Sequence, residues 1–144
     1  MNRVIARISP LILVLGLVYL AASGSLFSAN PLVIAGQLLA VALSIWARRS
    51  FTRGQFSIHP EPAGNRVIEN GPYKIIRHPM YAAALLLVWS SILGHISTIN
   101  LAIGLVITIL IANRMIFEER ILAERLTGYA AYALRTKRLI PFVL

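Results

Sequence analysis

The sequence contains no cysteine and no aspartate, and five glutamates are the only acidic side chains among its 144 residues. The absence of cysteine excludes disulfides, Cys-ligated zinc, iron–sulfur clusters and thiol catalysis. The G-x-G-x-x-G, Walker A and G-x-S-x-G patterns are absent as well, and no βαβ pattern predicts a soluble dinucleotide-binding domain. The three histidines are scattered, with His59 and His95 apart from the motifs described below, so we predict no metal site.

Charge of either sign is scarce in this chain, whereas apolar residues are abundant. Hydrophobic residues make up 58% of the sequence and charged residues 13%, and the mean hydropathy is +0.75. Such a composition is typical of an integral membrane protein and not of a soluble domain. The net charge of +9 would suggest nucleic acid in a soluble protein. Here we interpret it as membrane topology and predict no nucleic-acid partner.

Four apolar segments account for most of the hydrophobic residues: 8–22, 31–47, 79–96 and 99–117. The short polar links SGSLFSAN and GHISTIN join them in pairs, which favours two antiparallel helical hairpins. The longer segment 48–78 is rich in proline, glycine and charge, so we expect a loop outside the membrane. We therefore predict a single all-α membrane domain over 1–144 with four transmembrane helices.

All 14 Lys and Arg residues lie before the first apolar segment, in the long loop, or at and beyond the end of the fourth segment. All five glutamates lie in the same regions. With four spans these regions share one side of the membrane, and the positive-inside rule makes that side cytoplasmic. We expect a multi-pass protein of the cytoplasmic membrane with both termini inside. A cleaved signal peptide at the N-terminus is the alternative, but its removal would break the first hairpin.

The tail 118–144 begins with EERILAERL, and we expect the helix of the fourth segment to continue past Phe117 into this stretch. Its apolar residues fall near helical spacing on one face: Leu122, Leu126, Tyr129, Ala130 and Ala133. This pattern predicts an amphipathic helix that lies on the inner membrane surface. We expect Gly128 to interrupt the helix and Pro141 to end it.

Arg114 lies within the fourth apolar segment, where an ionisable group is costly and is a candidate for function. The alternative is that its long side chain reaches out to the lipid headgroups. Glu118 is four residues on and shares its helix face, so the pair is either a simple ion pair or a site whose guanidinium holds a carboxylate. Glu119 points about 100° away and could serve another partner. We interpret Arg120 and Glu124, which have the same spacing, as a surface pair.

The start of the third segment is unusually polar. G-P-Y at 71–73 predicts a turn, and R-H-P-M-Y at 77–81 puts Pro79 in the first helical turn. Arg77 and His78 therefore lie at the mouth of a helix, whose N-terminus favours anionic groups. Tyr81 follows one turn inside. A histidine at this position is often only a cap, but Arg, His and two Tyr facing the Arg/Glu pair of the next helix indicate a polar site.

Two stretches together resemble a known family. They are NRVIENGPYKIIRHPMY and, after the last span pair, NRMIFEERILAERLTGYAAYALRTKRLIP. The combination resembles the isoprenylcysteine carboxyl methyltransferase family, within a broader group that includes the phospholipid methyltransferases, and it covers roughly residues 50–141. The resemblance implies a small helical membrane enzyme without a Rossmann fold. It also implies that S-adenosylmethionine is used at the cytoplasmic face.

The resemblance also implies which residues form the site. The cofactor would be held by Asn65, Arg66, Val67, Ile68, Tyr73, His78, Pro79, Met80, Tyr81, Glu118 and Glu119. Arg114 is associated with the substrate, and Arg77 and Glu118 complete the expected catalytic set. The acceptor would be the carboxylate of a prenylated or other lipid-like molecule from the bilayer. Methyl transfer is an in-line displacement, so such a carboxylate needs orientation by a cation and no general base.

Three other functions remain open from the sequence. A lipid amine could be methylated instead, with Glu118, Glu119 or His78 taking the proton. A non-enzymatic membrane assembly protein could use the basic face to bind anionic lipid. A reductase is the third, since some sterol reductases have a similar helical end. The acceptor and the oligomeric state are not indicated by the sequence.

Overall fold

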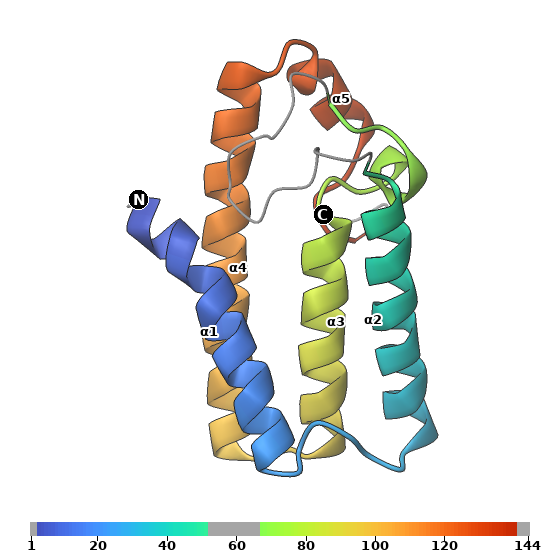
Figure 1. Ribbon diagram of the computed structural model, residues 1–144, viewed down its shortest axis with the longest axis vertical. Helices are drawn as coiled ribbons and strands as arrows, with labels where there is room; N and C mark the ends of the chain where they lie inside the picture. Colours follow the sequence, from blue (N-terminus) through green and yellow to red (C-terminus); the bar gives the residue numbers. More distant parts are fainter. Residues whose placement is uncertain (1–2, 52–66, 141–144) are drawn as a thin grey trace.

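The computed structural model describes residues 3–51 and 67–140, and within these ranges it is helical, without a β-strand. Its elements are α1 (Arg3–Ala22), α2 (Pro31–Arg49), the short 3-10 helix η1 (Gly71–Lys74), α3 (Pro79–Gly94), α4 (Thr98–Arg125) and α5 (Tyr129–Arg135) (Figure 1). The all-α prediction is confirmed. The two short links lie at one end of the bundle, and η1 and α5 lie at the other (Figure 1).

The helix bounds differ from the predicted segments mainly around α3 and α4. The third segment was expected to reach residue 96, but α3 ends at Gly94. Ser97 caps α4 through a hydrogen bond of 3.1 Å from the Asn100 N–H, so the residues before Ser97 are needed for the turn. As expected, the helix of the fourth segment continues past Phe117, and α4 ends at Arg125, because the residues that follow Phe117 are strong helix formers.

Two of the described helices, α2 and α4, are long and apolar enough to cross a membrane. The apolar part of α1, Ile8–Ala22, and α3 are shorter. Large apolar side chains are exposed along the outer faces of the bundle, among them Leu11, Leu15, Leu32, Leu38, Leu105 and Ile109. An exposed apolar surface of this extent is expected of a protein in a bilayer.

The closest helix pairs are not the predicted hairpins. α2 packs most closely against α3, and α1 packs against α4. Gly36 makes the first contact possible, because a Cβ at this position would collide with the Ser90 side chain of α3. The Gln37 amide fixes the link between α1 and α2, since it donates to the Leu26 carbonyl and to Ser91 Oγ at 3.0 Å.

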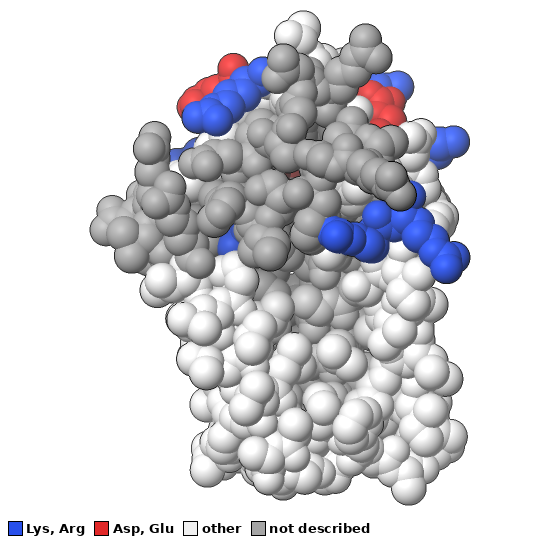
Figure 2. All heavy atoms as spheres, in the orientation of Figure 1, with Lys and Arg blue, Asp and Glu red and all other residues white. Residues whose placement is uncertain are grey.

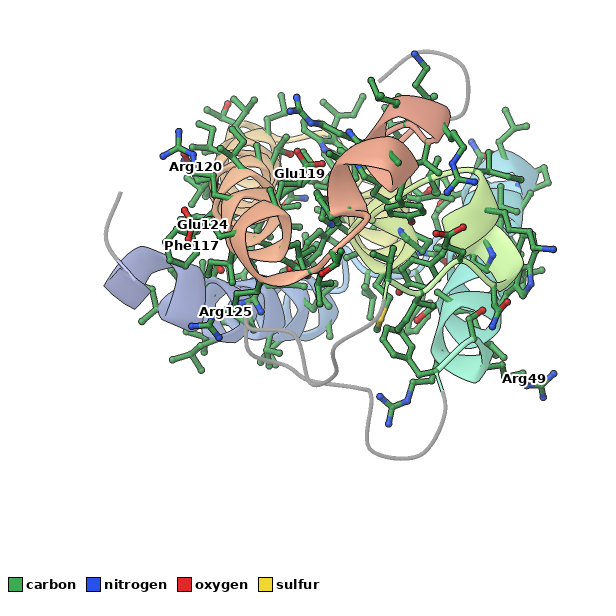
Figure 3. The ribbon with its side chains drawn as sticks, turned by 90° about the horizontal axis from the view of Figure 1, so that it is seen from above. Arg49, Phe117, Glu119, Arg120, Glu124 and Arg125 are labelled. Carbon is green, nitrogen blue, oxygen red and sulfur yellow. The ribbon has the colours of Figure 1, made fainter. Side chains whose placement is uncertain are left out.

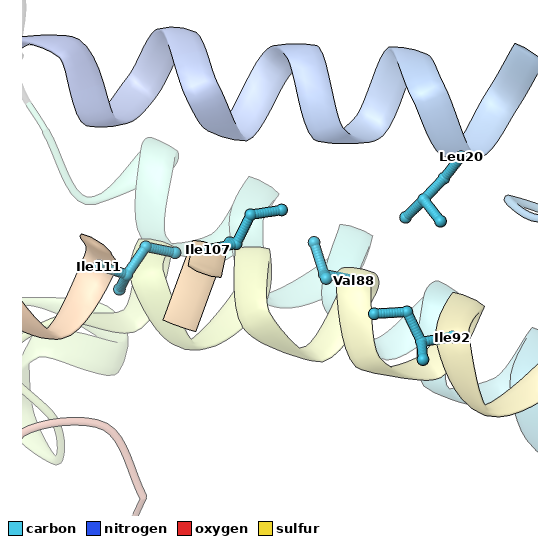
Figure 4. Packing of buried hydrophobic residues seen from close by; sticks show 5 residues of the cluster. All are labelled: Leu20, Val88, Ile92, Ile107 and Ile111. Atoms are coloured by element: carbon cyan, nitrogen blue, oxygen red, sulfur yellow. The ribbon is translucent and has the colours of Figure 1, made fainter. Parts of the chain in front are cut away.

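The core lies where α1, α3 and α4 meet. Its buried members are Leu20, Val88, Ile92, Ile107 and Ile111 (Figure 4). Gly104 lets α4 approach α3, because a Cβ there would lie 2.6 Å from Ile92 Cδ1. α3 therefore has packed neighbours on several sides, and its polar first turn is held within the bundle.

The charged side chains gather at one end of the molecule. On the face that Figure 2 shows, Lys, Arg and Glu lie over the part that carries α5 and η1, and the opposite half is free of them. The described structure therefore gathers the polar residues of the long loop, the start of α3 and the end of α4.

The C-terminal helical pattern is split into two helices. α4 ends at Arg125, with Leu126 in an extended conformation, and Gly128 precedes α5 with a φ of +88°, a left-handed conformation that glycine adopts without strain. The seven-residue α5 then buries Tyr129 and Tyr132 together with Leu126. Ala130, expected on the apolar face, is exposed. The predicted interfacial helix is therefore a short helix packed on the end of the bundle.

Candidate active site

The short helix η1 holds the chain just before α3 against α2 and α5. Gly71 has a φ of +57°, and a Cβ there would collide with the Ser50 side chain at the end of α2. Tyr73 is buried, and its carbonyl accepts a hydrogen bond of 2.8 Å from the Tyr132 hydroxyl of α5. The turn predicted at 71–73 is thus a 3-10 turn that joins α2 to α5.

The start of α3 is tied to the chain that follows α5. Ile76 and Lys137 form a parallel β-bridge, with the Arg77 N–H donating to the Lys137 carbonyl at 2.7 Å. The His78 N–H donates to the Arg138 carbonyl at 3.0 Å. Pro79 stands in the first turn of α3, as predicted, and needs no such bond.

Arg77 connects three elements. Its Nε donates to Glu119 Oε1 at 2.8 Å, and its Nη1 donates to the carbonyls of Ala133, at 2.7 Å, and Thr136. These bonds join the start of α3 to α4 and to the end of α5. The geometry therefore gives Arg77 a structural role, and its catalytic role stays a prediction.

Glu119 is the centre of a group of charges that we call the Glu119 cluster: Arg77, His78, Glu119 and Arg138. Besides Arg77, it receives His78 Nε2 at 3.3 Å and Arg138 Nε at 3.0 Å. Figure 3 looks onto this end and shows Glu119 pointing from α4 toward α5, away from the exposed pair of Arg120 and Glu124. Glu118 and Glu119 thus have different partners, as their angular separation on the helix suggests.

Arg114 is buried, with 6% of its surface exposed, so its side chain does not extend to the lipid headgroups. Its Nε donates to the Tyr81 hydroxyl at 2.7 Å, and that hydroxyl donates to Glu118 Oε2 at 2.5 Å. Ser9 of α1 lies 3.5 Å from Arg114 Nη1. We call Arg114, Tyr81 and Glu118 the Arg114 relay. Arg114 and Glu118 are joined through α3, and not only along their own helix.

His78 lies between the two groups. Its imidazole belongs to the Glu119 cluster, and its ring stacks on the Tyr81 ring with centroids 5.4 Å apart and planes 20° apart. The Glu119 cluster and the Arg114 relay therefore form one continuous site at the end of α3 and α4.

The tyrosines of η1 and α5 are neutral hydroxyls at physiological pH. Burial, followed by the negative charge of Glu118, raises the pKa of Tyr73 above its ordinary value. Burial likewise raises the pKa of Tyr132 to about 12, although Arg77 opposes the shift. These hydroxyls keep their protons and can both donate and accept hydrogen bonds.

An apolar groove of about 420 Å³ lies beside the site. It is lined by Leu43, Trp46, Pro72, Ile75, Ile76, Ala82, Leu85, Leu86, Trp89, Leu139 and Ile140. Pro72, Ile76 and Ala82 are the chain neighbours of Tyr73, Arg77 and Tyr81. One end of the groove is therefore at the level of the polar site.

The remaining predicted site residues belong neither to the Glu119 cluster nor to the Arg114 relay. Asn65 and Arg66 lie outside the described residues, as does His59. Val67 packs against the buried cluster of α5, while Ile68 is half-buried. Met80 is half-buried in the first turn of α3. Among the residues of 3–51 and 67–140, no three His, Cys, Asp or Glu side chains are close enough to hold a metal ion.

Sequence reasoning did not single out several residues that pack or hydrogen-bond around the site: Ser9, Tyr129, Tyr132, Thr136 and Arg138. The pair Tyr129 and Tyr132 and the run R-T-K-R at 135–138 can be recognised in the sequence. The residues that they contact cannot be predicted from it. Only the bridge between 76 and 137 brings Arg138 to Glu119.

Comparison with known proteins gives one match. The sequence model of the phospholipid methyltransferase family matches residues 25–130, well over half of the chain. The matched region contains the Arg114 relay and most of the Glu119 cluster. Searches of curated proteins and of solved structures give no match.

Proposed function

Because the chain belongs to the phospholipid methyltransferase family, we propose that it transfers a methyl group from S-adenosylmethionine to a lipid-like acceptor taken from the bilayer. The observation that carries the proposal is the buried Arg114 relay at the polar end of an apolar bundle. Burying a guanidinium in an apolar bundle costs free energy, and residues buried in this way usually have a function. The broader group expected from the sequence is the family that matches.

The described residues fit the cofactor chemically. S-adenosylmethionine supplies a methyl group on a positively charged sulfur, together with an amino acid and a nucleoside. Tyr73, His78, Tyr81 and Glu118 offer aromatic faces, neutral hydroxyls and a carboxylate in one place. We propose that these residues hold the cofactor, with the backbone of Val67 and Ile68 beside them. Asn65 and Arg66 lie outside the described residues.

Arg114 would orient the acceptor. Tyr81 holds its Nε, so the guanidinium keeps one direction, and a guanidinium fixed in this way suits the binding of an anion. A carboxylate acceptor then attacks without losing a proton, and orientation is the main contribution to the rate. We therefore propose carboxyl O-methylation of a prenylated or similar lipid as the first candidate reaction.

Methylation of a phospholipid amine is the second candidate. Arg114 would then hold the phosphate of the headgroup, since guanidinium binds phosphate as well as carboxylate. Glu118 would accept the proton, because its partner is the Tyr81 hydroxyl, which carries no positive charge. Glu119 suits this role less, because Arg77, His78 and Arg138 already bind it. A methyl ester releases methanol in alkali and an N-methyl group does not, which separates the two reactions.

The proposal includes a topology in which α1 to α4 all cross the membrane and the site faces the cytoplasm. It is supported by the apolar outer faces of the bundle and by the gathering of charge at one end. Labelling of single introduced cysteines from the two sides of sealed vesicles tests this orientation, and the chain has no cysteine that would interfere.

The direct test is calorimetric binding of S-adenosylhomocysteine to the purified protein. We expect binding by the wild type and an affinity at least about tenfold lower in Tyr81→Ala, because the ring that stacks on His78 is lost. Tyr19→Ala is the matched control, since this tyrosine is exposed on α1. A well-folded wild type that does not bind the ligand would refute the proposed function.

The apolar groove is the described surface that best fits the acceptor chain. Leu86 lines it one turn beyond Ala82, so Leu86→Trp should fill space without touching the Arg114 relay. We expect the KM for a long-chain acceptor to rise about tenfold, with unchanged affinity for S-adenosylhomocysteine. Leu105→Trp, at an exposed position of α4, is the control. Equal KM values in the two variants would exclude the groove.

A further inference from the structure

The hydroxyl of Tyr129 is unusual among the described residues. The side chain is 5% exposed, its oxygen is buried, and it has no hydrogen-bond partner within the described part of the chain. Buried hydroxyls in folded proteins normally have a partner. The neighbouring Tyr132 follows this rule, since its hydroxyl donates to the Tyr73 carbonyl at 2.8 Å. Of the two buried tyrosines of α5, one therefore has a partner in η1 and the other has none among the described residues.

The ring of Tyr129 is well fixed. It packs in the buried cluster with Leu126 and Tyr132, and the two tyrosine rings have centroids 5.9 Å apart. Gly128, with its φ of +88°, turns the chain so that Tyr129 faces the bundle. The position of the hydroxyl is therefore set by packing on all sides of the ring, and not by a hydrogen bond of its own.

The surroundings of the hydroxyl carry both signs of charge. Burial, followed by the negative charge of Glu119, raises the pKa of Tyr129, while the nearby Arg77 acts in the opposite direction. Glu118 of the Arg114 relay contributes as well. Tyr129 thus keeps its proton and lies within electrostatic range of both parts of the site, whose charges of both signs suit a ligand with an ammonium and a carboxylate.

We propose that the Tyr129 hydroxyl binds the amino-acid end of the S-adenosyl ligand. This inference rests on the proposed methyltransferase function. The hydroxyl would accept from the ammonium or donate to the carboxylate of the ligand, which supplies the partner that the described protein lacks. Tyr129 is then a cofactor-binding residue contributed by α5, and α5 forms part of the pocket wall.

The test compares Tyr129→Phe with Tyr132→Phe, because each variant removes one hydroxyl from the same helix. Two ligands are titrated into the purified protein: S-adenosylhomocysteine, and 5′-methylthioadenosine, which has the nucleoside but no amino acid. We expect Tyr129→Phe to bind S-adenosylhomocysteine about three- to tenfold more weakly and methylthioadenosine as the wild type does. Its melting temperature without ligand should equal that of the wild type.

Tyr132→Phe should show the reverse. It loses the bond to the Tyr73 carbonyl, so its melting temperature falls, while the folded protein binds S-adenosylhomocysteine within about twofold of the wild type. Unchanged affinity in Tyr129→Phe would overturn the inference, as would equal weakening of both ligands. Failure of the wild type to bind S-adenosylhomocysteine would instead refute the proposed function, so the two failures are distinguishable.

Discussion

Replacing Arg114 by alanine should lower kcat/KM for methyl transfer by at least about 100-fold and leave the affinity for S-adenosylhomocysteine within about threefold of the wild type. The side chain is buried and its Nε is fixed by Tyr81, so the guanidinium is oriented before any acceptor arrives. Loss of this orientation affects the transfer step, whereas the cofactor retains Tyr73, His78 and Glu118. The measurements are initial rates with a lipid acceptor and calorimetry with S-adenosylhomocysteine.

Two further variants make the Arg114 result specific. Arg120→Ala removes the same charge from an exposed position of α4 that points away from the site, and it should keep wild-type activity (Figure 3). Arg114→Lys keeps the charge without the planar fork, so we expect activity between those of the wild type and Arg114→Ala. Wild-type turnover in Arg114→Ala would exclude the residue from acceptor binding. Parallel loss of turnover and cofactor affinity would assign it to the cofactor instead.

Glu119→Gln should lower the free energy of unfolding by about 2–4 kcal/mol, which is the effect of leaving the buried Arg77 guanidinium without its counterion. The Glu119 side chain is 13% exposed, and those of its partners Arg77 and His78 are 10% and 4% exposed. Arg138 is 49% exposed and water can solvate it, so its part of the effect should be small. The measurement is the midpoint of thermal or denaturant unfolding in a fixed detergent.

Glu124→Gln is the matched control, because it makes the same change on the same helix at an exposed position (Figure 3). We expect a change below about 0.5 kcal/mol. Arg138→Gln should also have a small effect, which separates the exposed ion pair from the buried ones. If Glu119→Gln and Glu124→Gln unfold at the same midpoint, the Glu119 cluster does not hold the start of α3 to α4.

The helices could be predicted from sequence because their signals are local. Apolar runs about as long as a bilayer is thick define them, and Pro79 fixes the start of α3 without reference to the rest of the chain. The extension of α4 past Phe117 could also be predicted, because hydropathy changes there while helix propensity does not. The packing of α2 on α3 was missed because it depends on Gly36 meeting Ser90, and composition does not indicate which faces meet.

Sequence reasoning named many of the residues that the structure brings together at the end of α3 and α4, but few of the contacts between them. Spacing along one helix placed Arg114 and Glu118 on one face, but the residue that joins them, Tyr81, comes from α3. Glu119 was separated from Glu118 by helix geometry alone, yet its partner Arg138 reaches it only through the bridge at Ile76. Contacts between residues distant in sequence require the fold, which is why α5 could be interpreted as a surface helix.

The bridge between 76 and 137 also has a consequence for biosynthesis. Arg77 binds the carbonyl of Thr136, which lies 59 residues further along the chain. The first turn of α3 therefore lacks this hydrogen bond until all of α4 and α5 have been synthesised. During that interval Arg77 and His78 have none of their later backbone partners, and the loop to be closed includes an entire hairpin. The Glu119 cluster is therefore completed only after the chain beyond α5 has been synthesised.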